Sequence, residues 1–238
     1  MELNVAAACE AIARAHPGRE ALVTSAGSFT WAQVQDRTRR LAAVLAGAGL
    51  GHHADVDGDR SWSSPHDHVA LYLYNGHEYL EGMLGAWKAR CAPFNVNYRY
   101  VAEELRYLLD DADTRAVVVQ DRFAEVLSEV LPTLRRPPEL VLQVRDGSGH
   151  ELLPGAIDYE AALAAADPEL PADLVDSWDG DDLYLCYTGG TTGMPKGTMW
   201  RQADFVVAAL GVGRRDGTEY EDLAQLVDDA RGTVRALP

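Results

Sequence analysis

Short apolar segments alternate with amphipathic ones through most of this chain, and the alternation narrows the folds that it can adopt. Buried strands are predicted in the apolar segments, at residues 69–74, 115–120, 140–144 and 181–187. Helices are predicted between and around them, over residues 77–90, 102–109, 123–134 and 161–166. Strands that alternate with helices, without hairpin signals between them, are joined by crossovers and pair in parallel. The chain is therefore predicted to be an α/β protein with a mostly parallel sheet and flanking helices.

The two ends of the chain predict further local structure. Asn4 is suited to cap a helix over residues 5–15. Thr30 and Gln33 have the spacing of a capping box, which predicts a second helix from there to about Gly47. Short strands around a turn and a last helix are expected at residues 20–24, 28–30 and 221–231.

The charge of the chain excludes some partners. Lys and Arg number 21 against 37 Asp and Glu, which gives a formal net charge of −16. A nucleic-acid-binding surface needs a surplus of basic residues, so no nucleic acid partner is expected. A nucleotide is compatible with this charge, because a small anion needs only a local group of donors. Residues 151–182 hold many acidic side chains and no basic one, as in a solvated loop or an acidic docking surface.

Hydrophobicity and cysteine content indicate the class of protein and its compartment. Hydrophobic residues make up 47% of the sequence, which excludes wholesale disorder. No apolar run approaches the roughly 20 residues of a membrane helix, so no transmembrane segment is expected. The first residues lack the basic and apolar regions of a secretory signal. Cys9, Cys91 and Cys186 are too far apart for a disulfide framework, and a cytoplasmic location is expected.

The polar segment at residues 51–67 interrupts the alternation and has two interpretations. Its potential metal ligands, counting the next residue, are His52, His53, Asp55, Asp57, Asp59, His66, Asp67 and His68. A calcium loop that started at Asp55 would need Gly at position 60 and Glu at position 66, where this chain has Arg60 and His66. We therefore expect an exposed surface insertion at residues 51–67, with a metal site as the alternative.

Chemistry is concentrated in ten residues directly after the strand predicted at 181–187. They are Thr188, Gly189, Gly190, Thr191, Thr192, Gly193, Met194, Pro195, Lys196 and Gly197. Glycines allow main-chain N–H groups to approach an anion, and threonine hydroxyls and a lysine add donors and positive charge. The segment is not a Walker A loop, because Pro195 precedes the lysine and Gly197 follows it. We expect an irregular turn of ten residues that binds a polyphosphate.

This segment also carries a resemblance to a known family. Residues 187–197, YTGGTTGMPKG, resemble the phosphate-binding signature of the adenylate-forming enzymes, the AMP-dependent synthetase/ligase superfamily. The branch that it is most similar to is that of the bacterial fatty acyl-CoA synthetases. Supporting segments are Phe29-Thr30-Trp31, Asn75-Gly76-His77-Glu78-Tyr79, Pro93-Phe94-Asn95-Val96-Asn97-Tyr98-Arg99 and Ala102-Glu103-Glu104-Leu105. The resemblance covers nearly the whole chain and fits least well at residues 51–67.

The resemblance implies a ligase that works in two steps. A carboxylic acid, a fatty acid in this branch, would attack the α-phosphate of ATP, and coenzyme A would then take the acyl group from the acyl-adenylate. Lys196 would be the catalytic residue, because its charge stabilises the pyrophosphate leaving group. Thr188 would help to hold Mg²⁺. The nucleotide-binding residues implied in this way are Thr188, Gly189, Gly190, Thr191, Thr192, Gly193 and Lys196.

The resemblance also implies that the family's later motifs are missing. After Gly197 we find no adenine-binding aromatic segment, no ribose-binding aspartate and no small carboxy-terminal domain with its catalytic lysine. Residues 1–238 are therefore expected to be a partial N-terminal AMP-binding domain that needs a missing C-terminal half and is inactive alone. The alternatives are a non-catalytic nucleotide-binding or regulatory module and an unstable remnant.

Overall fold

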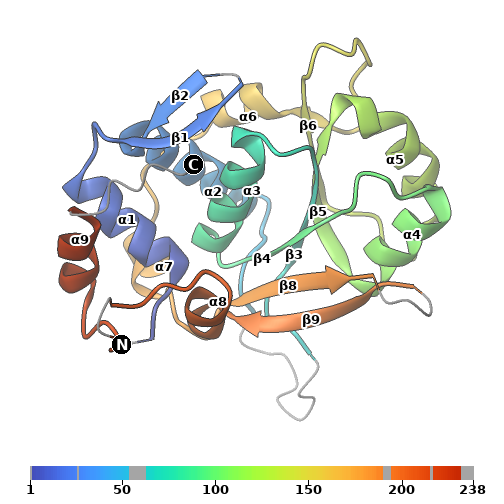
Figure 1. The fold of residues 1–238 in the computed structure, drawn as a ribbon. Coiled ribbons are helices and arrows are strands. Elements are labelled where there is room, and N and C mark those ends of the chain that lie inside the picture. Colours follow the sequence, from blue (N-terminus) through green and yellow to red (C-terminus); the bar gives the residue numbers. More distant parts are fainter. Residues whose placement is uncertain (1, 26, 54–62, 190–193, 215–216, 232–238) are drawn as a thin grey trace.

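The computed structural model describes residues 2–25, 27–53, 63–189, 194–214 and 217–231. Within them one sheet of seven strands has the order β7-β6-β5-β3-β4-β8-β9 (Figure 1). Its strands are β3 (His68–Tyr72), β4 (Ala92–Asn95), β5 (Thr114–Gln120), β6 (Leu140–Val144), β7 (Ile157–Asp158), β8 (Leu183–Thr188) and β9 (Lys196–Arg201). Neighbouring strands are parallel except β8 and β9, which form an antiparallel pair at one edge. The prediction of a mostly parallel α/β sheet is confirmed.

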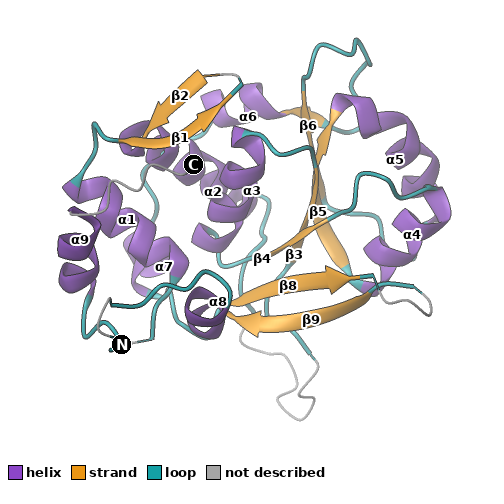
Figure 2. Cartoon of the chain, in the orientation of Figure 1, coloured by secondary structure: helices purple, strands orange, loops and turns teal. Residues whose placement is uncertain are grey.

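Helices cover both faces of the sheet (Figure 2). On one face lie α2 (Trp31–Gly47), α3 (His77–Lys88) and α6 (Tyr159–Ala165), and on the other lie α4 (Ala102–Asp111) and α5 (Ala124–Val130). Alternate residues of β3 enter the two cores, since Leu71 packs with the first group and Ala70 and Tyr72 pack with the second. Burial on both faces explains why residues 69–73, which include most of β3, form an uninterrupted apolar run in the sequence.

The amino-terminal elements flank this sheet. They are α1 (Val5–Ala15) and a separate hairpin of β1 (Glu20–Thr24) and β2 (Gly27–Thr30). The Asn4 side chain accepts a hydrogen bond from the Ala7 N–H at the start of α1. Thr30 and Gln33 form the expected capping box at the start of α2. Both capping predictions are confirmed.

Some elements differ from the sequence-based expectation. The helix predicted at 123–134 is divided into η1 (Asp121–Phe123), α5 and η2 (Leu131–Thr133), because Pro132 cannot donate to the last turn of α5. The helix predicted at 221–231 is α9 (Leu223–Arg231), which packs on α1. Elements without a counterpart in the prediction are β4, β7, β9, α7 (Ala172–Asp176) and α8 (Gln202–Ala208).

The segment at residues 51–67 is described only at its two flanks. His52 and His66 form an isolated antiparallel bridge there, and their rings meet edge to face with centroids 4.9 Å apart. His66 and Asp67 are only 6% and 9% exposed, so this flank is part of the interior and the expectation of an exposed insertion is wrong for these two residues. Three of the potential ligands, Asp55, Asp57 and Asp59, lie outside the described residues.

Candidate functional site

The hairpin of β8 and β9 positions the sequence-predicted phosphate residues. Thr188, the last residue of β8, is the cross-strand partner of Lys196, the first residue of β9. Directly opposed residues of an antiparallel pair project from the same face of a sheet. The hydroxyl of Thr188 and the ammonium group of Lys196 therefore emerge together, and both residues are exposed.

The extent of the irregular segment is a correction to the expectation. Thr188, Lys196 and Gly197 lie in strands, so the connection between β8 and β9 spans residues 189–195 rather than ten residues. A strand tolerates Gly197 here because the ring of its cross-strand partner Tyr187 covers it. Four of the expected nucleotide-binding residues, Gly190, Thr191, Thr192 and Gly193, lie outside the described residues, and Gly189 directly precedes them.

The hairpin forms a lateral edge of the sheet, beside β4. Its strand β8 runs parallel to β4, with Phe94 opposite Leu185. The end of β8 lies beside the C-terminal end of α4, where the Tyr187 hydroxyl donates a hydrogen bond to Asp111. Thr188 and Lys196 therefore lie near this end of α4.

Aromatic and basic side chains that follow the carboxyl ends of β3, β4 and β5 form what we call the aromatic shelf: Tyr74, Tyr98, Phe123, Arg99 and Arg122. The ring centroids of Tyr74 and Tyr98 are 4.7 Å apart, and each residue is 39% exposed. The guanidinium of Arg122 lies 5.0 Å from the Tyr74 centroid, and that of Arg99 lies 5.4 Å from the Tyr98 centroid. Exposed aromatic rings beside guanidinium groups suit a ligand with a planar ring and phosphates.

Sequence reasoning assigned no role to the aromatic shelf. The available signal was an aromatic residue shortly after each of three apolar strands, at Tyr74, Tyr98 and Phe123. Parallel strands bring their carboxyl ends to one edge, so residues at equivalent positions after different strands become neighbours. One of those strands, β4, was not predicted, and the pattern was incomplete without it.

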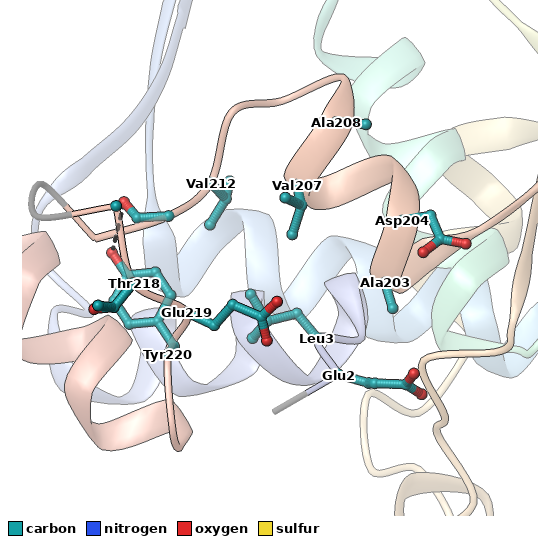
Figure 3. A pocket seen from close by; sticks show the side chains of 12 residues that line it. Glu2, Leu3, Ala203, Asp204, Val207, Ala208, Val212, Thr218, Glu219 and Tyr220 are labelled. Atoms are coloured by element: carbon teal, nitrogen blue, oxygen red, sulfur yellow. Dashed lines mark hydrogen bonds between the residues drawn. The ribbon is translucent and has the colours of Figure 1, made fainter.

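The groove in Figure 3 lies apart from the turn end of the hairpin, and it does not suit a polyphosphate. Its volume is about 470 Å³, and α8, which follows the other end of β9, forms one wall. Glu2, Asp204 and Glu219 contribute carboxylates to its lining. Anionic phosphates are repelled by such a lining, so the groove is no alternative to the hairpin as a nucleotide site.

The buried flank of the segment at 51–67 is an ion-pair cluster. Arg90 donates to Asp182 Oδ1 at 3.0 Å and 2.7 Å, and His66 Nε2 lies 3.8 Å from the same oxygen. Burial lowers the pKa of His66 to about 4, so the ring is neutral at pH 7. Across the described residues, no group of three or more His, Cys, Asp or Glu side chains is arranged to hold a metal ion. The alternative of a metal site therefore has no support from these flanks.

Comparisons with known proteins indicate one family over most of the chain. Residues 9–229 match the family model of the AMP-binding enzymes. The medium-chain acyl-CoA ligase Mig of Mycobacterium avium is 45% identical over 208 residues, which are 87% of this chain and 37% of that enzyme. The 3-oxocholest-4-en-26-oate–CoA ligase of Rhodococcus rhodochrous is 38% identical over 96% of this chain and 39% of its own length.

Solved structures show the same fold. The anthranilate CoA ligase AuaEII, in complex with anthranoyl-AMP, has a TM-score of 0.70 and 20% identity over 85% of this chain and 36% of that one. The N-terminal domain of FACL13 from Mycobacterium tuberculosis has a TM-score of 0.65 and 25% identity over 85% of this chain and 45% of that one.

The fold defines an α/β class of protein, with a mostly parallel sheet flanked by helices. The family match then places the chain plainly: it belongs to the AMP-binding enzyme family. Its curated relatives are acyl-CoA ligases, and the chain spans about 37–39% of the length of the two compared above. No helix in the described part of the chain has the length and apolarity to cross a membrane.

Proposed function

We propose that this chain is the N-terminal part of an acyl-CoA synthetase and supplies its polyphosphate site. The observation that supports this most is the pairing of Thr188 with Lys196 across the β8–β9 hairpin. Pyrophosphate gains negative charge as it leaves the α-phosphate of ATP, and an ammonium group held on a strand stabilises that charge. Lys196 is the catalytic residue in this proposal, and residues 188–193 bind the nucleotide.

The residues present fit a magnesium ion in part. Mg²⁺ prefers oxygen ligands and keeps several waters when it binds beside phosphates. The exposed hydroxyl of Thr188 is an oxygen donor of this kind, at the end of β8 and opposite Lys196. When bound, the ion supplies positive charge to the phosphates, and Thr188 orients it or one of its waters.

Coenzyme A is the ligand that we propose for the aromatic shelf. Its adenine is a planar ring that stacks on exposed tyrosines, and its phosphates pair with guanidinium groups. The carboxylic acid is a fatty acid in this proposal, in line with the medium-chain acyl-CoA ligase from Mycobacterium avium. The three cysteines are free thiols, which is consistent with a cytoplasmic location.

The test is a titration of the 238-residue chain with ATP and magnesium, followed calorimetrically. Lys196→Ala is expected to weaken ATP binding about tenfold or more, because it removes one charge-assisted contact to phosphate. Arg14→Ala is the control: Arg14 is exposed and lies in the last turn of α1, at the amino-terminal flank of the sheet. Equal ATP affinity in the wild type and the Lys196 variant would contradict the assignment.

A non-catalytic nucleotide-binding module is the second candidate, and a complementation assay separates the two. The chain is mixed with the remaining part of the Mycobacterium avium relative, and pyrophosphate release is measured with ATP, magnesium and medium-chain fatty acids. If the chain is part of a synthetase, pyrophosphate is released by the mixture and not by the chain alone. Saturable ATP binding without any adenylate from the mixture would favour the module instead.

A further inference from the structure

The face of the hairpin opposite Thr188 and Lys196 carries a side-chain arrangement with no assigned role. Tyr187 is the cross-strand partner of Gly197, and a Cβ atom added to Gly197 would lie 2.7 Å from Cζ of the Tyr187 ring. The Tyr187 hydroxyl donates a hydrogen bond to Oδ2 of Asp111, the last residue of α4, at 2.9 Å. The ring therefore lies over Gly197 and is tied at its far end to a helix.

The register of β8 and β9 decides whether Thr188, which follows Tyr187, and Lys196, which precedes Gly197, project from the same face of the sheet. A slip of one residue in an antiparallel pair moves every side chain of one strand to the opposite face. Lys196 would then face the α4 side of the sheet, while Thr188 would stay on the other side. The pairing of β8 with β9 therefore decides on which face each of the two side chains lies.

We propose that Tyr187, Gly197 and Asp111 form a register lock that makes Tyr187 and Asp111 positioning residues for the polyphosphate site. The proposal rests on the proposed function only for the identity of the ligand. Only glycine leaves room for the ring at position 197, so the ring selects one register. Asp111 belongs to a helix whose Leu105 and Leu108 are fully buried, so the phenol is held against a fixed part of the fold. Figure 1 shows the turn end of the hairpin beside α4.

The protonation state of the phenol agrees with this geometry. Burial and the neighbouring Asp111 carboxylate raise the pKa of Tyr187 well above its usual value. The hydroxyl is therefore protonated throughout the physiological range and remains a hydrogen-bond donor to the carboxylate.

A disulfide between the two strands measures the register of β8 and β9. Cys186 and Thr198 are cross-strand partners, so Thr198→Cys places a second thiol opposite the native one. In the full chain, mild oxidation is expected to join the Cys186 thiol readily to the thiol introduced at position 198. Adding Gly197→Ala or Tyr187→Ala should slow bond formation at least about fivefold, because the strands no longer keep one register. Unchanged rates in both backgrounds would overturn the lock.

Positioning is measured with ATP binding. Tyr187→Phe and Asp111→Ala each remove the hydrogen bond and should weaken ATP binding about threefold to tenfold, and the double variant should be no weaker than either single one. The matched control is Tyr159→Phe, because Tyr159 donates to Glu81 Oε2 at 2.8 Å in a buried phenol–carboxylate pair far from the hairpin. That variant should lower the melting temperature similarly and leave ATP affinity and disulfide formation unchanged.

The outcomes separate the two proposals. If Tyr187→Phe and Tyr159→Phe change ATP affinity equally, Tyr187 is a structural residue and the positioning role is wrong. If the wild type itself binds no ATP, the proposed function fails, and the disulfide rates alone decide whether the lock exists.

Discussion

Lys88 Nζ lies 2.7 Å from Glu10 Oε1 in the interior, where the two side chains are 1% and 5% exposed. Lys88 also donates to Thr38 Oγ1 at 2.9 Å, and Arg39 donates to both oxygens of Glu10 at 2.9 Å and 2.8 Å. The cluster joins α1, α2 and α3, which carry these residues. Burial lowers the pKa of Lys88, and the charge of Glu10 opposes that shift. The buried charge of the Lys88 ammonium group is therefore compensated mainly by the carboxylate of Glu10.

Glu10→Gln is expected to destabilise the fold more than Lys88→Met. The glutamine variant keeps an amide oxygen beside Lys88 but removes the negative charge that compensates the buried ammonium group, which costs about 3–5 kcal/mol. The methionine variant leaves Glu10 paired with Arg39, and its cost should be about 1–3 kcal/mol. Urea denaturation at pH 7 measures both. A larger loss for Lys88→Met would contradict this account of the cluster.

Gly85→Ala is expected to destabilise the contact between α2 and α3. A Cβ atom at Gly85 would lie 2.6 Å from Cδ2 and 2.8 Å from Cβ of the buried Leu41. Relieving that overlap costs about 1–3 kcal/mol, which outweighs the gain in helix propensity. The control is Gly47→Ala at the exposed end of α2, where nothing lies within 4 Å, and it should stabilise by up to about 1 kcal/mol. Thermal unfolding should show opposite shifts.

Stability is expected to fall between pH 6.5 and about 4 because of His66. Burial lowers the folded-state pKa of this ring from 6.5 to about 4, so the unfolded chain binds more protons in that interval. The contribution is complete above pH 6.5, is lost as the pH falls towards 4, and amounts to about 3 kcal/mol at most. Urea denaturation over this range should show a smaller slope for His66→Gln than for the wild type.

The control for this pH prediction is His150→Gln, in the loop between β6 and β7. His52 and His68 also have lowered pKa values, mainly because of burial, so some slope should remain in the His66 variant. An identical slope in the His66 variant and the wild type would show that His66 is not the group responsible.

Arg122→Ala is expected to weaken coenzyme A binding about threefold to tenfold, because it removes a guanidinium from the aromatic shelf. The measurement is a calorimetric titration with coenzyme A. Arg136→Ala is the matched control, since Arg136 forms an exposed ion pair with Asp113 just before β6, at the opposite edge of the sheet. If the two variants lose affinity equally, the shelf does not bind coenzyme A.

Much of the central fold was predictable because its signals are local. The segment predicted as a strand at 140–144 coincides with β6, and the capping residues Asn4 and Thr30 with Gln33 mark the starts of α1 and α2. Such signals act within a few residues, so the sequence shows them directly. The hairpin strand β9 was missed for the opposite reason. Its Gly197 disfavours a strand locally, and only the Tyr187 ring from another strand makes that residue suitable.

The sequence alone determined the alternating α/β pattern, the family resemblance and the glycine- and threonine-rich segment that ends at Lys196. Tertiary structure decided that Thr188 and Lys196 face the same way, that Asp111 holds Tyr187, and that Lys88 pairs with Glu10 from a distant part of the chain. These relationships depend on strand register and helix packing. Register and packing are set by the free energy of the assembled core, which no short stretch of sequence contains.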